Sequence, residues 1–324
     1  MGDALGVPMI GRRPATADFP TLDTTPRDMT GGGPFELLPG QCSSPTQLAV
    51  MTWKHLQRDG KFDFLEYARD LVQWSQATAG ADALEHLRLA CARLAEGSPP
   101  EGVGESLWLE ALRPEGSAVP LAQVVPLAVH FPAREARFDA TVAAVQLTDF
   151  APESVVGAAL LNGVIAGAIA SPAERIDTKA LAVVAENELS YAAATLGKRH
   201  PDWVSDIKKA ADGLRADLRA AQHADPQMYG PEVFIHGPQG GTARVAIRLA
   251  LWEVFHAPSF EAAVLDVANR GGESNLTGAI TGAVFGAIWG EAAIPTEWRE
   301  RMLFASEPDA AWLAFHPRQF IPPS

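Results

Sequence analysis

The chain has 324 residues, of which 47% are hydrophobic, and a formal net charge of −13. This length and hydrophobic content allow one large buried core. The excess of carboxylates argues against nucleic acid or an anionic membrane as a partner, because phosphates are bound by clustered Lys and Arg. Two cysteines, Cys42 and Cys91, provide no disulfide framework and no signal peptide is recognised, so we expect a cytoplasmic protein.

An all-α fold is expected, because Ala, Leu, Glu and Arg dominate and alternating strand-like runs are scarce. The first element is a short helix over 2–8. Residues 12–40 are rich in Thr, Pro, Asp and Gly and have no helical period, which predicts a surface loop. Such a long loop is either a lid over a cleft or a plain connector, and both interpretations stay open.

The next helix is predicted over 46–58, and the residues before it are typical of a helix N-terminus. Ser44 is the expected N-cap, Pro45 takes the first helical position, and Gln47 completes a capping box. The alternative is a nucleophile among Cys42, Ser43 and Ser44 whose pKa is lowered by the helix dipole. No histidine neighbour is known that would support this alternative.

The middle of the chain predicts a series of packed helices. The segment 155–170 is apolar and contains small residues, which favours a buried helix over a membrane span. The segment 204–223 is heavily charged and is typical of a solvated outer helix. The other predictions are helices over 62–80, 81–96, 134–146 and 177–200, a Pro/Gly break over 98–104, and an apolar element over 123–130.

The last third contains a stripe of glycines at Gly278, Gly282, Gly286 and Gly290. Their spacing of four predicts one face of a helix, approached by neighbouring helices almost backbone to backbone. Helices are also predicted over 243–255 and 260–269, and a tail over 305–324 that packs on the bundle. The glycine-rich loop 237–241 is either an ordinary turn or a loop whose backbone N–H groups contact phosphates. His130 and His236 are interpreted as structural or solvent-exposed residues rather than as ligands.

Several motifs resemble those of the ADP-ribosylglycohydrolase family. They are Gly2-Asp3-Ala4-Leu5-Gly6-Val7-Pro8, Gly31-Gly32-Gly33-Pro34-Phe35, Thr46-Gln47-Leu48-Ala49, Gly271-Gly272-Glu273-Ser274-Asn275, and the pattern through 241–298. The resemblance implies a single compact domain over 1–324, folded as an orthogonal helical bundle. It also implies an enzyme that removes ADP-ribose with the help of two Mg²⁺ ions.

The residues that carry this chemistry in the family differ here. Ser43-Ser44-Pro45-Thr46 aligns with the family's Thr-Asp-Asp-Thr, and Glu273-Ser274-Asn275-Leu276 with its Asp-x-Asp-Thr. Ile10 and Asp149 replace a glutamate and a histidine, and 117–123 lacks the family's glycine pair and arginine. One carboxylate of four remains, so we expect no metal cofactor: two Mg²⁺ ions about 3.5–4 Å apart need anionic ligands to offset their repulsion.

The sequence therefore predicts that magnesium-dependent hydrolysis is lost. A first hypothesis is that the remaining cleft binds a small ADP-ribosyl-like or nucleotide-like ligand. A second is metal-free acid–base chemistry by Glu273 or Asp149. A hydrolase with an altered site, and a purely structural or oligomer-forming role, are further alternatives. We expect a monomer. The candidate ligand-binding residues are Ser43, Ser44, Thr46, Gly32, Gly33, Phe35, Gly271, Gly272, Ser274, Asn275 and Gln123.

Overall fold

The computed structural model describes residues 1–13, 28–78, 84–171, 177–223 and 241–303. These residues form helices joined by turns, with two isolated β-bridges and no strand among them. The prediction of an all-α fold is therefore confirmed. The predicted tail over 305–324, His236 and most of the glycine-rich loop 237–241 lie outside the described residues.

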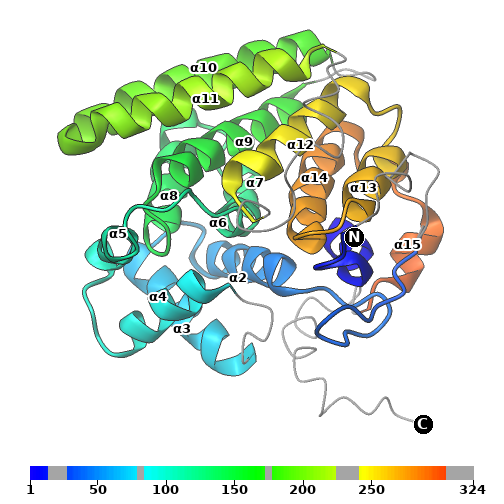
Figure 1. The fold of residues 1–324 in the computed structure, drawn as a ribbon, viewed down its shortest axis with the longest axis horizontal. Helices are drawn as coiled ribbons and strands as arrows, with labels where there is room; N and C mark the ends of the chain where they lie inside the picture. The colour runs from blue at the N-terminus through cyan, green and yellow to red at the C-terminus, as the bar shows by residue number, and fades with distance from the viewer. Residues whose placement is uncertain (14–27, 79–83, 172–176, 224–240, 304–324) are drawn as a thin grey trace.

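The segment from α2 to α5 forms one end of the bundle, where α3 packs on α2, α4 on α3 and α5 on α4, while α1 packs against helices from the last third of the chain (Figure 1). A Pro/Gly break was expected over 98–104, and this prediction is wrong in part, because α5 begins there with a proline in its first turn. Backbone N–H groups in the first turn of a helix have no hydrogen-bond partner within the helix, so a proline there costs no helical hydrogen bond. The elements are α1 Gly2–Gly6, η1 Val7–Met9, α2 Ser44–Asp59, α3 Phe64–Thr78, α4 Glu85–Ala95 and α5 Pro100–Glu110.

The second part surrounds a central pair of helices, α9 and α14, and carries α10 and α11 side by side on the outside (Figure 1). The apolar element expected over 123–130 is divided into the end of α6 and α7, which meet at Val124. The elements are α6 Val119–Gln123, α7 Val125–His130, α8 Arg134–Gln146, α9 Pro152–Ala170, α10 Thr178–Arg199, η3 Pro201–Trp203, α11 Val204–Ala221, α12 Ala243–His256, α13 Phe260–Asn269, α14 Ser274–Trp289, η5 Glu291–Ala293 and α15 Thr296–Arg301.

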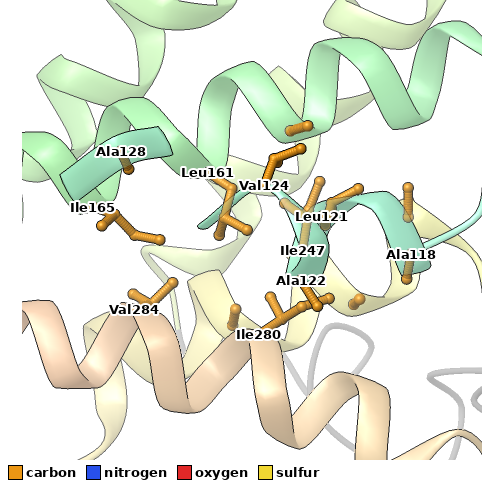
Figure 2. Packing of buried hydrophobic residues seen from close by; sticks show 14 of the residues in the cluster. Ala118, Leu121, Ala122, Val124, Ala128, Leu161, Ile165, Ile247, Ile280 and Val284 are labelled. Carbon is orange, nitrogen blue, oxygen red and sulfur yellow. The ribbon is translucent and has the colours of Figure 1, made fainter. Parts of the chain in front are cut away.

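The hydrophobic core lies where α6, α7, α9, α12 and α14 meet. Figure 2 shows aliphatic side chains from these helices pointing toward one another, among them Leu121, Leu161, Ile247 and Ile280. Each of these four side chains is buried. The main driving force for this packing is the removal of apolar surface from water, which contributes about 25 cal/mol for each Å² that is buried.

Helix α9 is the one helix in the described residues that is long and apolar enough to cross a membrane. Most of its apolar window, 72%, is buried inside the bundle. Its neighbours are α6, α7, α8, α10, α11, α12 and α14. The prediction of a buried helix at this place is confirmed.

The glycine stripe of α14 is covered for only half of its length. A Cβ atom added to Gly278 would lie 2.4 Å from the carbonyl oxygen of Gly2, so α1 packs there backbone to backbone. The same atom at Gly286 or Gly290 would meet nothing within 4 Å. The prediction of close backbone approach is thus correct at Gly278 and Gly282, where Gly2 lies against the stripe, and wrong at Gly286 and Gly290. Met1, Phe260 and the exposed part of the stripe line a groove of about 340 Å³.

Candidate functional site

A buried polar network joins α1, α2 and α14. Ser43 donates through its backbone N–H to Asp3 Oδ2 at 3.0 Å and through its hydroxyl to Asp3 Oδ1. The same hydroxyl accepts a hydrogen bond from Asn275 Nδ2 at 2.8 Å. Asp3, Ser43 and Asn275 are all buried. Three segments that are far apart in sequence therefore meet at one hydroxyl group.

The N-terminus of α2 is capped differently from the sequence-based prediction. The N-cap residue is Ser43 rather than Ser44, and its own side chain makes no capping hydrogen bond. The Asp3 carboxylate takes that role, since Thr46 N also donates to Asp3 Oδ2 at 3.2 Å. Gln47 forms no capping box in the structure, because its Oε1 accepts from Trp74 Nε1 at 2.9 Å.

Cys42 is not an activated nucleophile. Burial, followed by the charge of the nearby Asp3 carboxylate, raises the pKa of its thiol to about 11. The N-terminus and the hydrogen bond with Thr46 oppose this increase. A thiolate is the reactive form of cysteine, so this thiol is unreactive at neutral pH. The alternative of a helix dipole that lowers a nucleophile's pKa at this position is therefore wrong for Cys42.

The turn before α14 is held against the segment that follows α1. Gly11 N donates to Gly272 O at 2.8 Å, and Gly272 N donates to Arg12 O at 3.0 Å. Gly271 and Gly272 have φ angles of 76° and 60°, a region that favours glycine. Ser274 Oγ donates to Gly6 O at 2.7 Å. The glycines and Ser274 thus hold α1 and α14 together.

The glycine loop after residue 28 packs on the same centre. Gly32 and Leu37 exchange two backbone hydrogen bonds, of 2.7 and 3.0 Å. Gly33 lies so close to Val7 that an added Cβ would be 2.4 Å from the Val7 carbonyl oxygen. Phe35 is half-buried in this loop, and Gly32 is exposed. Of the loop residues predicted to bind ligand, Gly33 therefore borders η1.

Glu273 is half-buried at the N-cap position of α14. A Cβ added to Gly241 would lie 3.4 Å from Glu273 Cγ, which places this side chain beside the start of the segment that leads into α12. Gly241 O accepts a hydrogen bond from Ala118 N at 2.9 Å. Glu273 is thus brought close to the isolated β-bridge that pairs Ser117 with Thr242.

Asp149 is buried and fully engaged by donors. Its Oδ2 accepts from Ser117 N at 2.8 Å and from Ser154 Oγ at 2.7 Å, and its Oδ1 accepts from Ala151 N at 2.9 Å. These bonds tie Ser117 to the N-terminus of α9. The geometry supports a structural role, and the assignment of Asp149 as an acid–base residue stays a prediction.

Two residues stand apart from the sequence-based site. Gln123 is fully buried and donates to Tyr67 OH at 2.8 Å, so it lies in the core. His86 was not predicted: its Nε2 is buried without a hydrogen-bond partner, and burial lowers its pKa while Asp149 opposes that change. No local sequence feature distinguishes His86 from any other histidine on an amphipathic helix.

The residues at the family's metal position do not fit a pair of magnesium ions. Ser43 and Asn275 supply neutral oxygens, and both carboxylate oxygens of Asp3 accept hydrogen bonds from α2 or Ser43. No group of three or more His, Cys, Asp or Glu side chains in the described residues is arranged to hold a metal ion. Mg²⁺ is held mainly by carboxylate oxygens, and those of Asp3 are already engaged by hydrogen bonds.

The fold and this site define an all-helical protein whose polar centre lies between the ends of three helices. The chain belongs to the ADP-ribosylglycohydrolase family, whose model matches residues 1–315. The resemblance found in the motifs is therefore confirmed over nearly the whole chain.

Two relatives illustrate how far the similarity extends. An ADP-ribosylarginine hydrolase, Tri1, from Pseudomonas putida (strain GB-1) is 24% identical over 296 residues, covering 88% of this chain and 70% of the relative. A solved structure described as an ADP-ribosylglycohydrolase-related protein complex has a TM-score of 0.69 at 23% identity, covering 98% of this chain and 94% of the other. At that identity the structural likeness shows the fold.

Proposed function

We propose that this family member no longer carries out hydrolysis with a pair of magnesium ions and instead binds a small ADP-ribosyl-like or nucleotide-like ligand. The observation that carries the proposal is the closed Asp3–Ser43–Asn275 network at the metal position. Two Mg²⁺ ions bring four positive charges. The Asp3 carboxylate, already committed to the N-terminus of α2, and the carboxylate of Glu273 together cannot neutralise them in a buried site.

A polar ligand is favoured by one hydrogen-bond acceptor of the network that has no donor. Asn275 Oδ1 is buried and has no hydrogen-bond partner. Leaving such an acceptor unpaired costs about 1–3 kcal/mol, so a ligand hydroxyl that donates to it would gain that free energy. Ribose hydroxyl groups have this chemistry. Backbone N–H groups in the neighbouring turns at Gly32 and Gly272 are already paired and serve to shape the site.

Metal-free acid–base chemistry receives less support. Asp149 accepts three hydrogen bonds from neighbouring groups, which occupy most of the lone pairs that a base would use. Glu273 is the remaining carboxylate of the site, and it lies beside Gly241. The Glu273→Gln variant tests this route, because a glutamine keeps the shape and removes the proton acceptor.

Calorimetry and thermal denaturation test the proposal on the full chain. Titration with MgCl₂, alone and with ADP-ribose present, is expected to show no micromolar binding of two ions. ADP-ribose alone is expected to raise the melting temperature. The Asn275→Ala variant, compared with its own ligand-free melting temperature, is expected to lose this increase, while Glu135→Gln on the exposed face of α8 keeps it.

Two results would contradict these expectations separately. Micromolar binding of two Mg²⁺ ions, with magnesium-dependent release of ADP-ribose from an ADP-ribosylated arginine, would show that hydrolysis is retained. An unchanged melting temperature with ADP-ribose, AMP and NAD would show that the cleft does not bind this class of ligand.

A further inference from the structure

A second cavity lies between the end of α5, the start of α9, α11 and the start of α12, with a volume of about 410 Å³. It shares no lining residue with the Asp3–Ser43–Asn275 network. Cavities of roughly 300–1,000 Å³ are the usual size of small-molecule sites. Three cations, Arg113, Lys209 and Arg244, and three carboxylates, Glu115, Glu153 and Asp206, line this cavity.

Two of the cations are already committed to partners. Arg113 donates to Asp206 and lies over the rings of Trp108 and Trp203, 5.1 and 4.8 Å from their centroids. Arg244 Nε donates to Asp217 Oδ2 at 2.6 Å, and its Nη2 donates to Asp217 Oδ1 at 3.1 Å. These pairs leave little of either positive charge for a ligand.

The other three charges have no such partner. Lys209, Glu115 and Glu153 form no ion pair within 4 Å with any residue that the structure describes. Glu153 is half-buried, and its pKa is raised by burial first and by the Glu115 charge, with Lys209 only partly opposing. The cavity therefore holds two carboxylates and an ammonium group that form no direct ion pair, although Lys209 and Arg244 attract the carboxylates at longer range.

The rim of the cavity has a strained backbone. Leu112 and Arg113 have φ angles of 62° and 60°, in the left-handed region that residues other than glycine rarely adopt. The conformation is held by Arg113 N donating to Trp108 O at 2.8 Å. It leaves Leu112 88% exposed beside the cavity. Strain of this kind is concentrated at ligand-binding segments, and an exposed leucine offers an apolar contact.

We propose that this cavity binds a zwitterionic α-amino acid with an apolar side chain. The ammonium group lies between Glu115 and Glu153, and the carboxylate meets Lys209. The apolar side chain packs against Leu112 and the two prolines of the lining, Pro114 and Pro152. The site takes a ligand with charges of both signs because its own uncommitted charges are of both signs. It does not depend on what the Asp3–Ser43–Asn275 region binds.

Isothermal titration with three related probes tests the proposal. L-Leucine carries both charges, N-acetyl-L-leucine lacks the ammonium group, and L-leucinamide lacks the carboxylate. We expect saturable binding of L-leucine, and at least roughly tenfold weaker binding of each analogue, since each analogue lacks one of the two charged groups that the cavity binds. Equal binding of all three probes, or no saturable binding of L-leucine, would overturn the proposal.

Variants assign each charge to its partner. Glu115→Gln and Glu153→Gln are expected to weaken L-leucine about tenfold and to leave N-acetyl-L-leucine unchanged. Lys209→Gln is expected to weaken L-leucine and to leave L-leucinamide unchanged. Lys208→Gln is the matched control, because this neighbouring lysine of α11 is exposed and does not line the cavity. A loss of L-leucine binding in Lys208→Gln as large as in Lys209→Gln would refute the assignment.

Discussion

The carboxylate of Asp3 accepts hydrogen bonds from both the backbone N–H and the hydroxyl of Ser43, forty positions later in the chain. A side chain from α1 thereby caps α2, a role that usually belongs to the helix's own N-cap residue. The same serine reaches α14 through Asn275. One short polar network thus determines how three helices meet.

Asp3→Asn is expected to destabilise the protein. The amide would place N–H groups opposite the N–H groups of Ser43 and Thr46, which leaves buried donors unpaired. We expect a loss of about 2–4 kcal/mol in the free energy of unfolding. Urea denaturation measures it, and Asp202→Asn at an exposed position of η3 serves as the control. Equal stability of the two variants would show that the network contributes little.

The glycine stripe of α14 gives two opposite expectations for one substitution. Gly278→Ala places a methyl group 2.4 Å from Gly2 O and should cost about 1–3 kcal/mol, because two backbones would have to separate. Gly286→Ala meets nothing within 4 Å and should stabilise the helix by up to about 1 kcal/mol. Thermal denaturation of both variants checks the difference. The same sign for both would contradict the observed half-covered stripe.

Glu253 should make the stability fall as the pH rises. This residue is fully buried on α12, and burial, followed by the Asp266 carboxylate, raises its pKa well above 4.5, with Arg270 opposing in part. The folded chain therefore keeps a proton that the unfolded chain loses above about pH 4.3. The contribution is fully present below that pH and is lost as the pH rises toward the raised pKa of the folded state.

The Glu253→Gln variant should reduce this dependence, because glutamine resembles the protonated acid. We expect it to exceed the wild type in free energy of unfolding at pH 8 by at least about 1 kcal/mol, and to equal it near pH 4.5. Urea denaturation across this range checks the expectation, with the exposed Glu135→Gln as control. A constant difference between variant and wild type at all pH values would contradict it.

Both cysteines should be protected in the folded protein. Burial raises the pKa of Cys42 and of Cys91 to about 11 each, so the thiolate fraction at pH 8 is small. We expect no rapid reaction with a disulfide reagent under native conditions, and two thiols per chain after denaturation in urea. One fast-reacting thiol in the native protein that disappears in the Cys42→Ser variant would contradict this expectation and would show that Cys42 is a reactive nucleophile.

Local sequence features predicted local structure well. Ser44, Pro45 and Gln47 indicated the start of α2 to within two positions, and the apolar run of α9 indicated a buried helix. The break expected over 98–104 was wrong in part, because a proline can open a helix as well as end one. The motifs indicated the family, which the match over 1–315 confirms.

The contacts between distant segments could not be predicted in this way. Nothing near Asp3 in the sequence indicates that it caps α2, since that contact depends on how α1 packs along Gly278. The position of His86 near Asp149 depends likewise on the packing of α4. Gln123 was predicted to bind ligand from its alignment alone, and its burial beside Tyr67 follows from the division of α6 and α7.

The half-covered stripe has a practical consequence for work with purified protein. Met1 lines the groove that runs on from Gly2 along Gly282 and Gly286. A purification tag joined directly to Met1 would therefore begin on an apolar surface beside Asp3 rather than in free solvent. Measurements of ligand affinity or melting temperature should accordingly use protein from which any amino-terminal tag has been cleaved.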